Sequence, residues 1–279
     1  MIVLPLAWAL VIGTGACVGS FLNVCIHRLP LRESIVLPRS RCPSCGEGIA
    51  WYDNLPILSW LFLGGRCRSC RSPIPIRYPL VEASTIVLFA LLFAARGPSV
   101  LFLIHAVFGA AIIALIVIDA RHQILPDAIT LPGIAAGLLT VPLRGAAGPF
   151  PDFTLASARD ALVAAVLGYA LPWIVNASYR GWQAARGVPA GQREDGIGRG
   201  DFKFLAMIGA FLGVRLLIFT LFFGAISGAV VGLALIRFGG YGWKSKLPYG
   251  VFLGGAALLA LFAGELWVDW YLRFAGIGR

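Results

Sequence analysis

Four of the six cysteines form two Cys-x-x-Cys pairs, Cys42 with Cys45 and Cys67 with Cys70, and 21 residues separate the pairs. Two such pairs supply four thiolates, which is the ligand set and the spacing of a tetrahedral Cys₄ zinc site. The other interpretations are disulfides, which need an oxidising compartment, and a redox dithiol, which would use only one pair. A site with four protein ligands has no open position, so we predict a structural zinc ion that folds the region around it.

Two aspartates lie at the ends of strongly apolar runs. Asp119 follows the run 110–118, and Asp201 precedes a run that begins at Phe202. Carboxylates at membrane depth are costly and usually mark function. Two carboxylates that share a site do not both ionise readily, so one can take a proton from water while the other donates to a peptide carbonyl, as in aspartic proteases. The alternative is an interfacial aspartate paired with a neighbouring arginine, Arg121 or Arg199.

The residues around these aspartates allow more than one interpretation. Gly198 and Gly200 precede Asp201 and remove side-chain bulk, which would let a substrate backbone approach closely. A phosphate-binding loop is disfavoured here because no strand precedes the glycines and no Gly-Lys-Ser/Thr occurs. Asp127 follows Pro126 at the start of an apolar segment, where an acidic residue also suits the free backbone N–H groups of a helix start.

Membrane helices must position these side chains. The chain of 279 residues is 59% hydrophobic and 13% charged, with a mean hydropathy of +0.85, whereas soluble domains are about 25% charged. The first apolar run has no basic residue before it, so we expect a permanent helix rather than a cleaved signal. We expect about eight transmembrane helices, at 4–26, 80–95, 100–118, 128–143, 158–179, 202–214, 216–236 and 249–272, with Arg215 dividing the long run 202–238.

The distribution of basic residues predicts the orientation. With eight spans, 17 of the 23 Lys and Arg residues fall on the side that carries residues 27–79. A seven-span count would move Arg237, Lys244 and Lys246 to the other side, which fits the positive-inside bias less well. Residues 27–79 are therefore predicted to be cytoplasmic, where thiols stay reduced. The same bias explains the net charge of +10 without a nucleic-acid partner.

These residues carry a resemblance to the type IV prepilin peptidases of the Gly-x-Gly-Asp membrane protease group, over nearly the whole chain. The matching stretches are VGSFLNV at 18–24 with HRLP at 27–30, CPSCG at 42–46, LGGRCRSC at 63–70, RYPLVE at 77–82, ID at 118–119 with LPDAITLP at 125–132, and GRGDFKFLAMIGA at 198–210. Two positions depart from the family's pattern. Arg66 stands where the family has Lys, and Val251 stands where it often has a second proline.

The resemblance implies a bacterial inner-membrane enzyme whose active site faces the cytoplasm. Its catalytic pair would be Asp119 and Asp201, with Asp127, Gly198, Gly200 and Lys203 in support. It would cut type IV prepilins and pseudopilins after a glycine, between a short basic leader and an apolar helix. In many members S-adenosylmethionine also methylates the new N-terminal residue. Candidates for this second activity are Gly64, Gly65, Arg66 and Glu82, although the chain has no Rossmann-type methyltransferase fingerprint.

Together these inferences predict an all-α polytopic membrane protein in three parts: a first helix at 1–26, a cytoplasmic zinc domain at 27–79 and protease helices at 80–279. The polar segment 180–196 is expected to be a mobile linker. A peptidase without methylation is the main alternative function. A transporter with aspartates in broken helices would show paired, repeat-related breaks, and none are evident. A membrane thiol–disulfide protein would need its Cys pairs in an oxidising compartment, against the predicted orientation.

Overall fold

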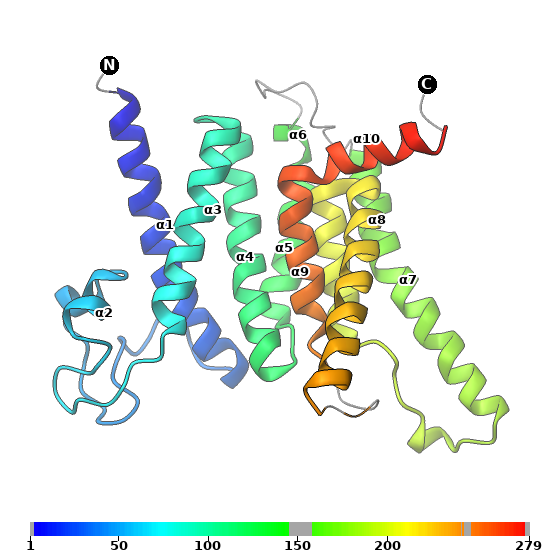
Figure 1. The fold of residues 1–279 in the computed structure, drawn as a ribbon, viewed down its shortest axis with the longest axis horizontal. Helices are drawn as coiled ribbons and strands as arrows, with labels where there is room; N and C mark the ends of the chain where they lie inside the picture. Colours follow the sequence, from blue (N-terminus) through cyan, green and yellow to red (C-terminus); the bar gives the residue numbers. More distant parts are fainter. Residues whose placement is uncertain (1–2, 145–157, 241, 243–246, 277–279) are drawn as a thin grey trace. The chain divides into compact units, whose positions relative to one another are not determined.

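The structure, a computed structural model, describes residues 3–144, 158–240, 242 and 247–276. The chain divides into two compact units, Met1–Val117 and Ile118–Arg279, and Figure 1 labels their helices. Within the described residues the regular elements are helices only, apart from two isolated β-bridges. They are α1 Val3–Arg28, η1 Leu29–Leu31, η2 Trp51–Asn54, α2 Leu58–Phe62, α3 Arg77–Arg96, α4 Val100–His122, α5 Asp127–Leu139, α6 Val141–Arg144, α7 Ala158–Ala185, η3 Ala190–Gln192, α8 Arg199–Phe238, α9 Tyr249–Leu259, the π-helical turn η4 Ala260–Gly264 and α10 Glu265–Phe274.

The all-helical membrane class predicted from the sequence is confirmed, and the count of eight spans is not. Over the described ranges, six helical segments are long and apolar enough to cross a bilayer: Leu4–Leu31, Arg77–Arg96, Val100–His122, Ala158–Ala185, Arg199–Phe238 and Tyr249–Phe274. The expected span 128–143 forms the shorter helices α5 and α6. The two expected spans between 202 and 236 fall within α8. Lys244 and Lys246, which weighed in the predicted orientation, lie outside the described residues.

The 40-residue helix α8 is bent back on itself at Gly213. At about 1.5 Å per residue a straight helix of this length would measure about 60 Å, roughly twice the thickness of a hydrocarbon core. Gly213 has φ 77° and ψ 178°, which is not helical and which a residue with a side chain rarely adopts. Gly200, near one end of α8, packs on Leu125, which also packs on Gly250 at the start of α9, and Gly232, near the other end of α8, packs on Leu247. Both ends of α8 therefore lie beside the start of α9.

The break predicted at Arg215 is thus two residues away from the residue that makes it. Arg215 instead pairs with α10, through Glu265 at 3.1 Å and through Asp269. A charge inside an apolar run suggested a loop, but the backbone required a residue that tolerates positive φ. The expected linker 180–196 is also shorter than predicted, because α7 continues to Ala185.

Helices α7 and α8 approach each other through glycines. A Cβ atom on Gly168 of α7 would lie 2.4 Å from the carbonyl oxygen of Leu205, and a Cβ on Gly209 of α8 would lie 2.4 Å from that of Ala164. Small residues at such positions let backbones pack closely, which drives association where lipid is as apolar as the helix surface. The pair runs antiparallel, so the end of α7 at Ala185 lies toward the start of α8.

The first unit is organised in the same manner around α1 and α3. A Cβ on Gly19 of α1 would lie 2.7 Å from the Cα of Glu82 on α3. Between these helices the chain leaves the bundle as a segment with short elements, η1, η2 and α2, and the four cysteines. Asn23 of α1 donates a hydrogen bond to the carbonyl oxygen of Tyr78 at 3.1 Å, which joins the two ends of that segment.

The close approach of α7 and α8 predicts a sharp penalty for one added methyl group. Gly209→Ala should destabilise the protein by about 1–3 kcal/mol, because the new methyl meets backbone rather than a side chain that can move. Thermal unfolding in detergent measures this as a lower Tm. Gly255→Ala is the matched control, since a Cβ there meets nothing within 4 Å and replacing a helical glycine should gain about 0.5–1 kcal/mol. Equal Tm values for the two variants would contradict this account of the packing.

Candidate active site and metal centre

Asp119 is a buried carboxylate held by the start of α9. It lies in the last turn of α4 and is 5% exposed. Its Oδ2 accepts a hydrogen bond from the backbone N–H of Val251 at 3.2 Å. A Cβ on Gly250 would lie 2.8 Å from the same oxygen, so only glycine lets the α9 backbone come this close. Because the first N–H groups of a helix have no intrahelical partner, the start of α9 provides donors for this carboxylate.

Asp201 is the second buried carboxylate, in the first turn of α8 and 8% exposed. Its backbone N–H donates to the carbonyl oxygen of Gly198 at 3.0 Å. Gly200, next to Asp201, lies against Leu125, and Leu125 also lies against Gly250, whose backbone contacts Asp119. The two carboxylates are close enough for the charge of Asp119 to act on Asp201. The structure therefore brings together the two aspartates that the sequence singled out, with the turn Tyr249–Gly250 beside both.

The two glycines before Asp201 face groups of the protein itself. A Cβ on Gly200 would lie 3.0 Å from the Cβ of Leu125, and Leu125 also packs against Gly250. A Cβ on Gly198 would lie 3.1 Å from the Asp201 carboxylate. The room that the sequence analysis assigned to a substrate backbone is thus filled at Gly200 by Leu125, and at Gly198 it adjoins the carboxylate.

Asp127 and Lys203 form an ion pair on the outside of this site. Asp127 is the first residue of α5, and Lys203 Nζ lies 2.6 Å and 2.8 Å from its two carboxylate oxygens. The Asp127 side chain is 58% exposed, and exposed ion pairs contribute only about 0–1 kcal/mol. The pair joins the start of α5 to the first turn of α8, which also carries Asp201.

The start of α9 is the part of this site that the motif analysis missed. Of this segment only Val251 was noticed, as a departure from a family pattern, yet the backbone of Gly250 and Val251 contacts Asp119. A usable signal was present, because Pro248 immediately before an apolar run marks a helix start with free N–H groups.

The four cysteines of the first unit converge on one point. The Sγ atoms of Cys42, Cys45, Cys67 and Cys70 all lie within 4.8 Å of one another. The Cys42 and Cys70 sulfurs are 3.8 Å apart. Four thiolates at about 2.3 Å from a zinc ion would be separated by about 3.8 Å. The donor set and its spacing therefore fit a single tetrahedral metal ion.

The two Cys-x-x-Cys pairs lie in two separate turns of the same type. The N–H of Cys42 donates to Glu47, and the N–H of Cys67 donates to Ser72, at 2.8 Å and 2.9 Å. One β-bridge closes each turn, Arg41 with Gly48 and Arg66 with Pro73. Hydrogen bonds from the backbone at Cys45 and then Ser44 lower the pKa of the Cys42 thiol to about 6. At Cys42 the turn thus favours the thiolate, which is the form that binds metal. At Cys45, despite a hydrogen bond from the backbone at Glu47, burial and the neighbouring thiols raise the pKa to about 11.

Three of the four methyltransferase candidates lie between α2 and the second cysteine pair. Gly64 and Gly65 both have positive φ, 61° and 67°. Gly65 packs on the ring of Trp60, where a Cβ would lie 2.9 Å from a ring carbon, whereas a Cβ on Gly64 meets nothing within 4 Å. Arg66 follows with its side chain exposed. The turn therefore presents open backbone next to a guanidinium.

Glu82, the fourth candidate, has a different environment. It is buried on α3, and its carboxylate accepts the backbone N–H of Ile57 at 2.7 Å and the Asn23 amide at 3.5 Å. Ile57 precedes α2 and has a positive φ of 61°. Through this hydrogen bond Glu82 holds Ile57, the positive-φ residue immediately before α2.

Comparison with known proteins places both units in one group. A family model described as the bacterial peptidase A24 N-terminal domain matches residues 14–96, and a model described as the type IV leader peptidase family matches residues 106–233. Three similar proteins are each named prepilin leader peptidase/N-methyltransferase. That of Burkholderia pseudomallei (strain 1026b) is 37% identical, over 98% of this chain and 89% of its own length.

The other two relatives come from Pseudomonas aeruginosa and Myxococcus xanthus. The first is 36% identical over 98% of this chain and 96% of its own length. The second is 43% identical over 80% of this chain, and the match spans only 61% of that relative. No solved structure matches the chain.

The convergence of the cysteines predicts that the first unit depends on a metal ion. Cys45→Ser should abolish stoichiometric metal binding and lower the Tm in detergent, because structural zinc contributes folding energy directly. Elemental analysis of the purified protein measures the metal and identifies it. Cys17→Ser is the control, since Cys17 lies in α1 outside the cluster. A well-folded protein that contains no metal would refute the prediction.

Proposed function

The chain belongs to the type IV leader peptidase family, and from that premise we propose that it is a membrane aspartyl endopeptidase that removes the leader of type IV prepilins, with Asp119 and Asp201 as its catalytic pair. The observation that carries this proposal is the placement of the two buried carboxylates close to the start of α9. A pair of this kind, near the end of one membrane helix and the start of another, needs a functional reason because burying carboxylates is costly.

The proposed chemistry is general acid–base hydrolysis. Val251 N–H donates to Asp119, an interaction that suits a carboxylate, so we assign the general base to Asp119. It takes a proton from a water molecule, whose oxygen attacks the scissile carbonyl carbon. The Asp201 carboxyl donates its proton to the carbonyl oxygen, which gives a tetrahedral gem-diol intermediate. Asp119 then passes the proton that it took from water to the leaving amine, and Asp201 takes a proton back from a hydroxyl of the intermediate as the C–N bond breaks and the new carboxyl group forms. Both carboxylates thereby return to their starting states.

The substrate follows from the relatives' names and from the predicted orientation. We propose cleavage after a glycine, between a short basic leader and an apolar helix, in prepilins and in pseudopilins. The chain would cross the inner membrane eight times, counting the two arms of α8 and the segment α5–α6 separately. Residues 27–79 and the catalytic pair would face the cytoplasm, in line with the bias of the basic residues.

A second activity, N-methylation of the new N-terminus, is proposed for the first unit. The relatives carry this activity in their names. S-adenosylmethionine would supply the methyl group. The open backbone at Gly64 beside the Arg66 guanidinium fits the carboxylate of its methionyl part, because guanidinium binds carboxylate in a fork geometry. Gly65 would shape this turn, and Glu82 would act through Ile57. The ion bound by the four cysteines would be structural zinc.

Cleavage of a prepilin tests the first activity. Purified protein in detergent should shorten a prepilin with a Gly–Phe junction, which mass spectrometry detects. Asp119→Ala and Asp201→Ala should each lower kcat by about 10⁴-fold, as expected for residues that act as a unit. Asp127→Ala should retain measurable activity because its carboxylate lies outside the pair. Glu33→Gln, at an exposed carboxyl, is the control. Full activity of either alanine variant of the pair would reassign the site.

Transfer of label tests the second activity. With S-adenosylmethionine labelled in its methyl group, the cleaved pilin should acquire one label at its N-terminus. Arg66→Ala should weaken this labelling by about 10-fold or more and leave cleavage intact, because the loss of a charged hydrogen bond costs about 1.5–3 kcal/mol. Cleaved but unlabelled product from the unaltered protein would mean that the chain is a peptidase alone.

A further inference from the structure

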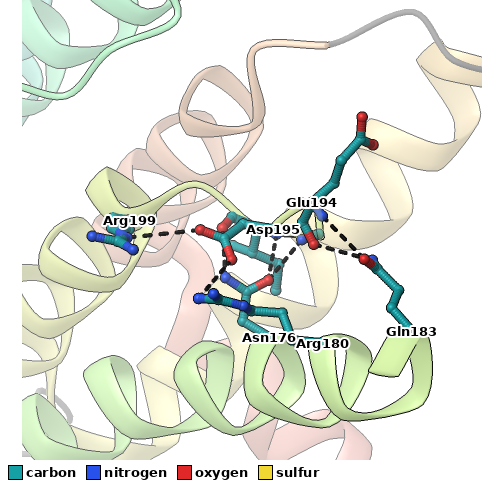
Figure 2. Close-up of polar contacts among 8 residues, drawn as sticks. Asn176, Arg180, Gln183, Glu194, Asp195 and Arg199 are labelled. Carbon is teal, nitrogen blue, oxygen red and sulfur yellow. Dashed lines mark hydrogen bonds and ion pairs between the residues drawn. The ribbon is translucent and has the colours of Figure 1, made fainter. Parts of the chain in front are cut away.

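The loop that leads into α8 is tied along one face of α7. Three α7 residues at helical spacing, Asn176, Arg180 and Gln183, point toward this loop, as Figure 2 shows. Residues four and three apart lie on the same face of a helix. The loop residues that they contact are Glu194 to Ile197. This segment ends only four residues before Asp201.

Asn176 uses both ends of its amide on this loop. Its Oδ1 accepts the backbone N–H groups of Gly196 at 2.7 Å and Ile197 at 3.1 Å. Its Nδ2 donates to the carbonyl oxygen of Ile197 at 3.2 Å. The side chain is 6% exposed. A buried amide with these contacts fixes the direction of the backbone it holds, because leaving any of these groups without a partner costs about 1–3 kcal/mol.

Gln183 makes an equivalent pair of contacts two helical turns further along α7. Its Oε1 accepts the N–H of Glu194 at 3.0 Å, and its Nε2 donates to the carbonyl oxygen of the same residue at 3.1 Å. Between the two amides, Asp195 pairs with Arg180 at 3.5 Å and with Arg199 at 3.7 Å. Arg199 is the first residue of α8, so these contacts tie residues 194 and 195 to α7 on one side and to the start of α8 on the other.

The register of α7 on α8 extends directly into these contacts. Along the antiparallel pair, Ala164 lies opposite Gly209 and Gly168 lies opposite Leu205. A further eight residues along α7 bring Asn176 opposite Ile197, which is the contact observed. The amide contacts and the glycine contacts therefore belong to one continuous interface, and Asp201 lies within it between Leu205 and Ile197.

We propose that Asn176 and Gln183 are positioning residues for Asp201, which hold residues 194–197 on α7 and so set the place of the first turn of α8 and its carboxylate. This inference rests on the proposed function, because it assigns the reason for the contacts to the reaction of Asp201. Neither amide contacts Asp119 or Asp201 in the structure, so each acts through the loop. A displacement of about 1 Å at a reacting group can lower the rate by about 10²-fold.

The test compares the kinetics of cleavage with the susceptibility of the loop to protease. Asn176→Leu and Gln183→Met keep the approximate volume and remove the hydrogen bonds. Each should lower kcat for prepilin cleavage by about 10- to 100-fold, with KM changed by less than about twofold. Each should also speed cleavage by trypsin after Arg193, since the next peptide unit is the one that Gln183 holds. Asn176→Asp keeps the acceptor for both N–H groups and should recover part of kcat.

Controls separate this inference from the proposed function and from misfolding. Ser178→Ala, at an exposed position of the same helix, should leave kcat, Tm and trypsin cleavage unchanged. If Asn176→Leu does not fold, Gln183→Met and Asn176→Asp carry the test. An unchanged kcat in a variant whose loop is loosened would overturn the positioning role and leave the proposed function intact. A raised KM would overturn it in favour of substrate contact. An unaltered protein that cuts no prepilin would overturn the proposed function and this inference with it.

Discussion

The burial of two carboxylates near the start of α9 is the constraint on which the second unit depends. Each is less than one-tenth exposed, and an unpaired buried charge carries a penalty of several kcal/mol. Within the described residues, the donor that reaches Asp119 belongs to the backbone and not to a basic side chain. Val251 N–H reaches Asp119, and the lysine nearest in sequence, Lys203, is engaged by Asp127 instead. A lysine or arginine in direct contact would favour the charged form of an aspartate strongly, whereas a backbone donor carries no full charge.

Backbone donors must be brought close, and this explains the small residues around the pair. Glycine is the only residue type that fits at position 250, where the α9 backbone approaches Asp119. The reversal of α8 at Gly213 places both arms of α8 beside α9. The first unit uses a different principle. Its segment between α1 and α3 contains only short helical elements, and within it four cysteines converge on one point and Asp53 pairs with Arg68. Hydrogen bonds from Arg68 keep the pKa of Asp53 below its usual range.

The chemistry of the chain could be predicted from its sequence better than its geometry. Cysteine spacing depends only on the ligand requirements of a metal, so the cluster followed from four residues, and the structure brings them together. The two aspartates were found because carboxylates rarely border apolar runs. The kink at Gly213 was placed at Arg215 because charge is visible in hydropathy and backbone strain is not. The contacts of Asn176 and Gln183 escaped notice for another reason. An amide in a helix carries no distinctive pattern, and its partners are backbone groups whose position depends on how α7 and α8 pack.

The reversal at Gly213 also limits how far the Asp201 arm can reach. The portion of α8 from Arg199 to the kink contains 14 residues, which corresponds to about 21 Å, while an average hydrocarbon core is about 30 Å thick. An arm this short would be mismatched if lipid surrounded it, but nearly every residue from Asp201 to Gly213 is buried inside the protein. Neighbouring helices therefore enclose the arm, so its length does not have to match the thickness of a bilayer.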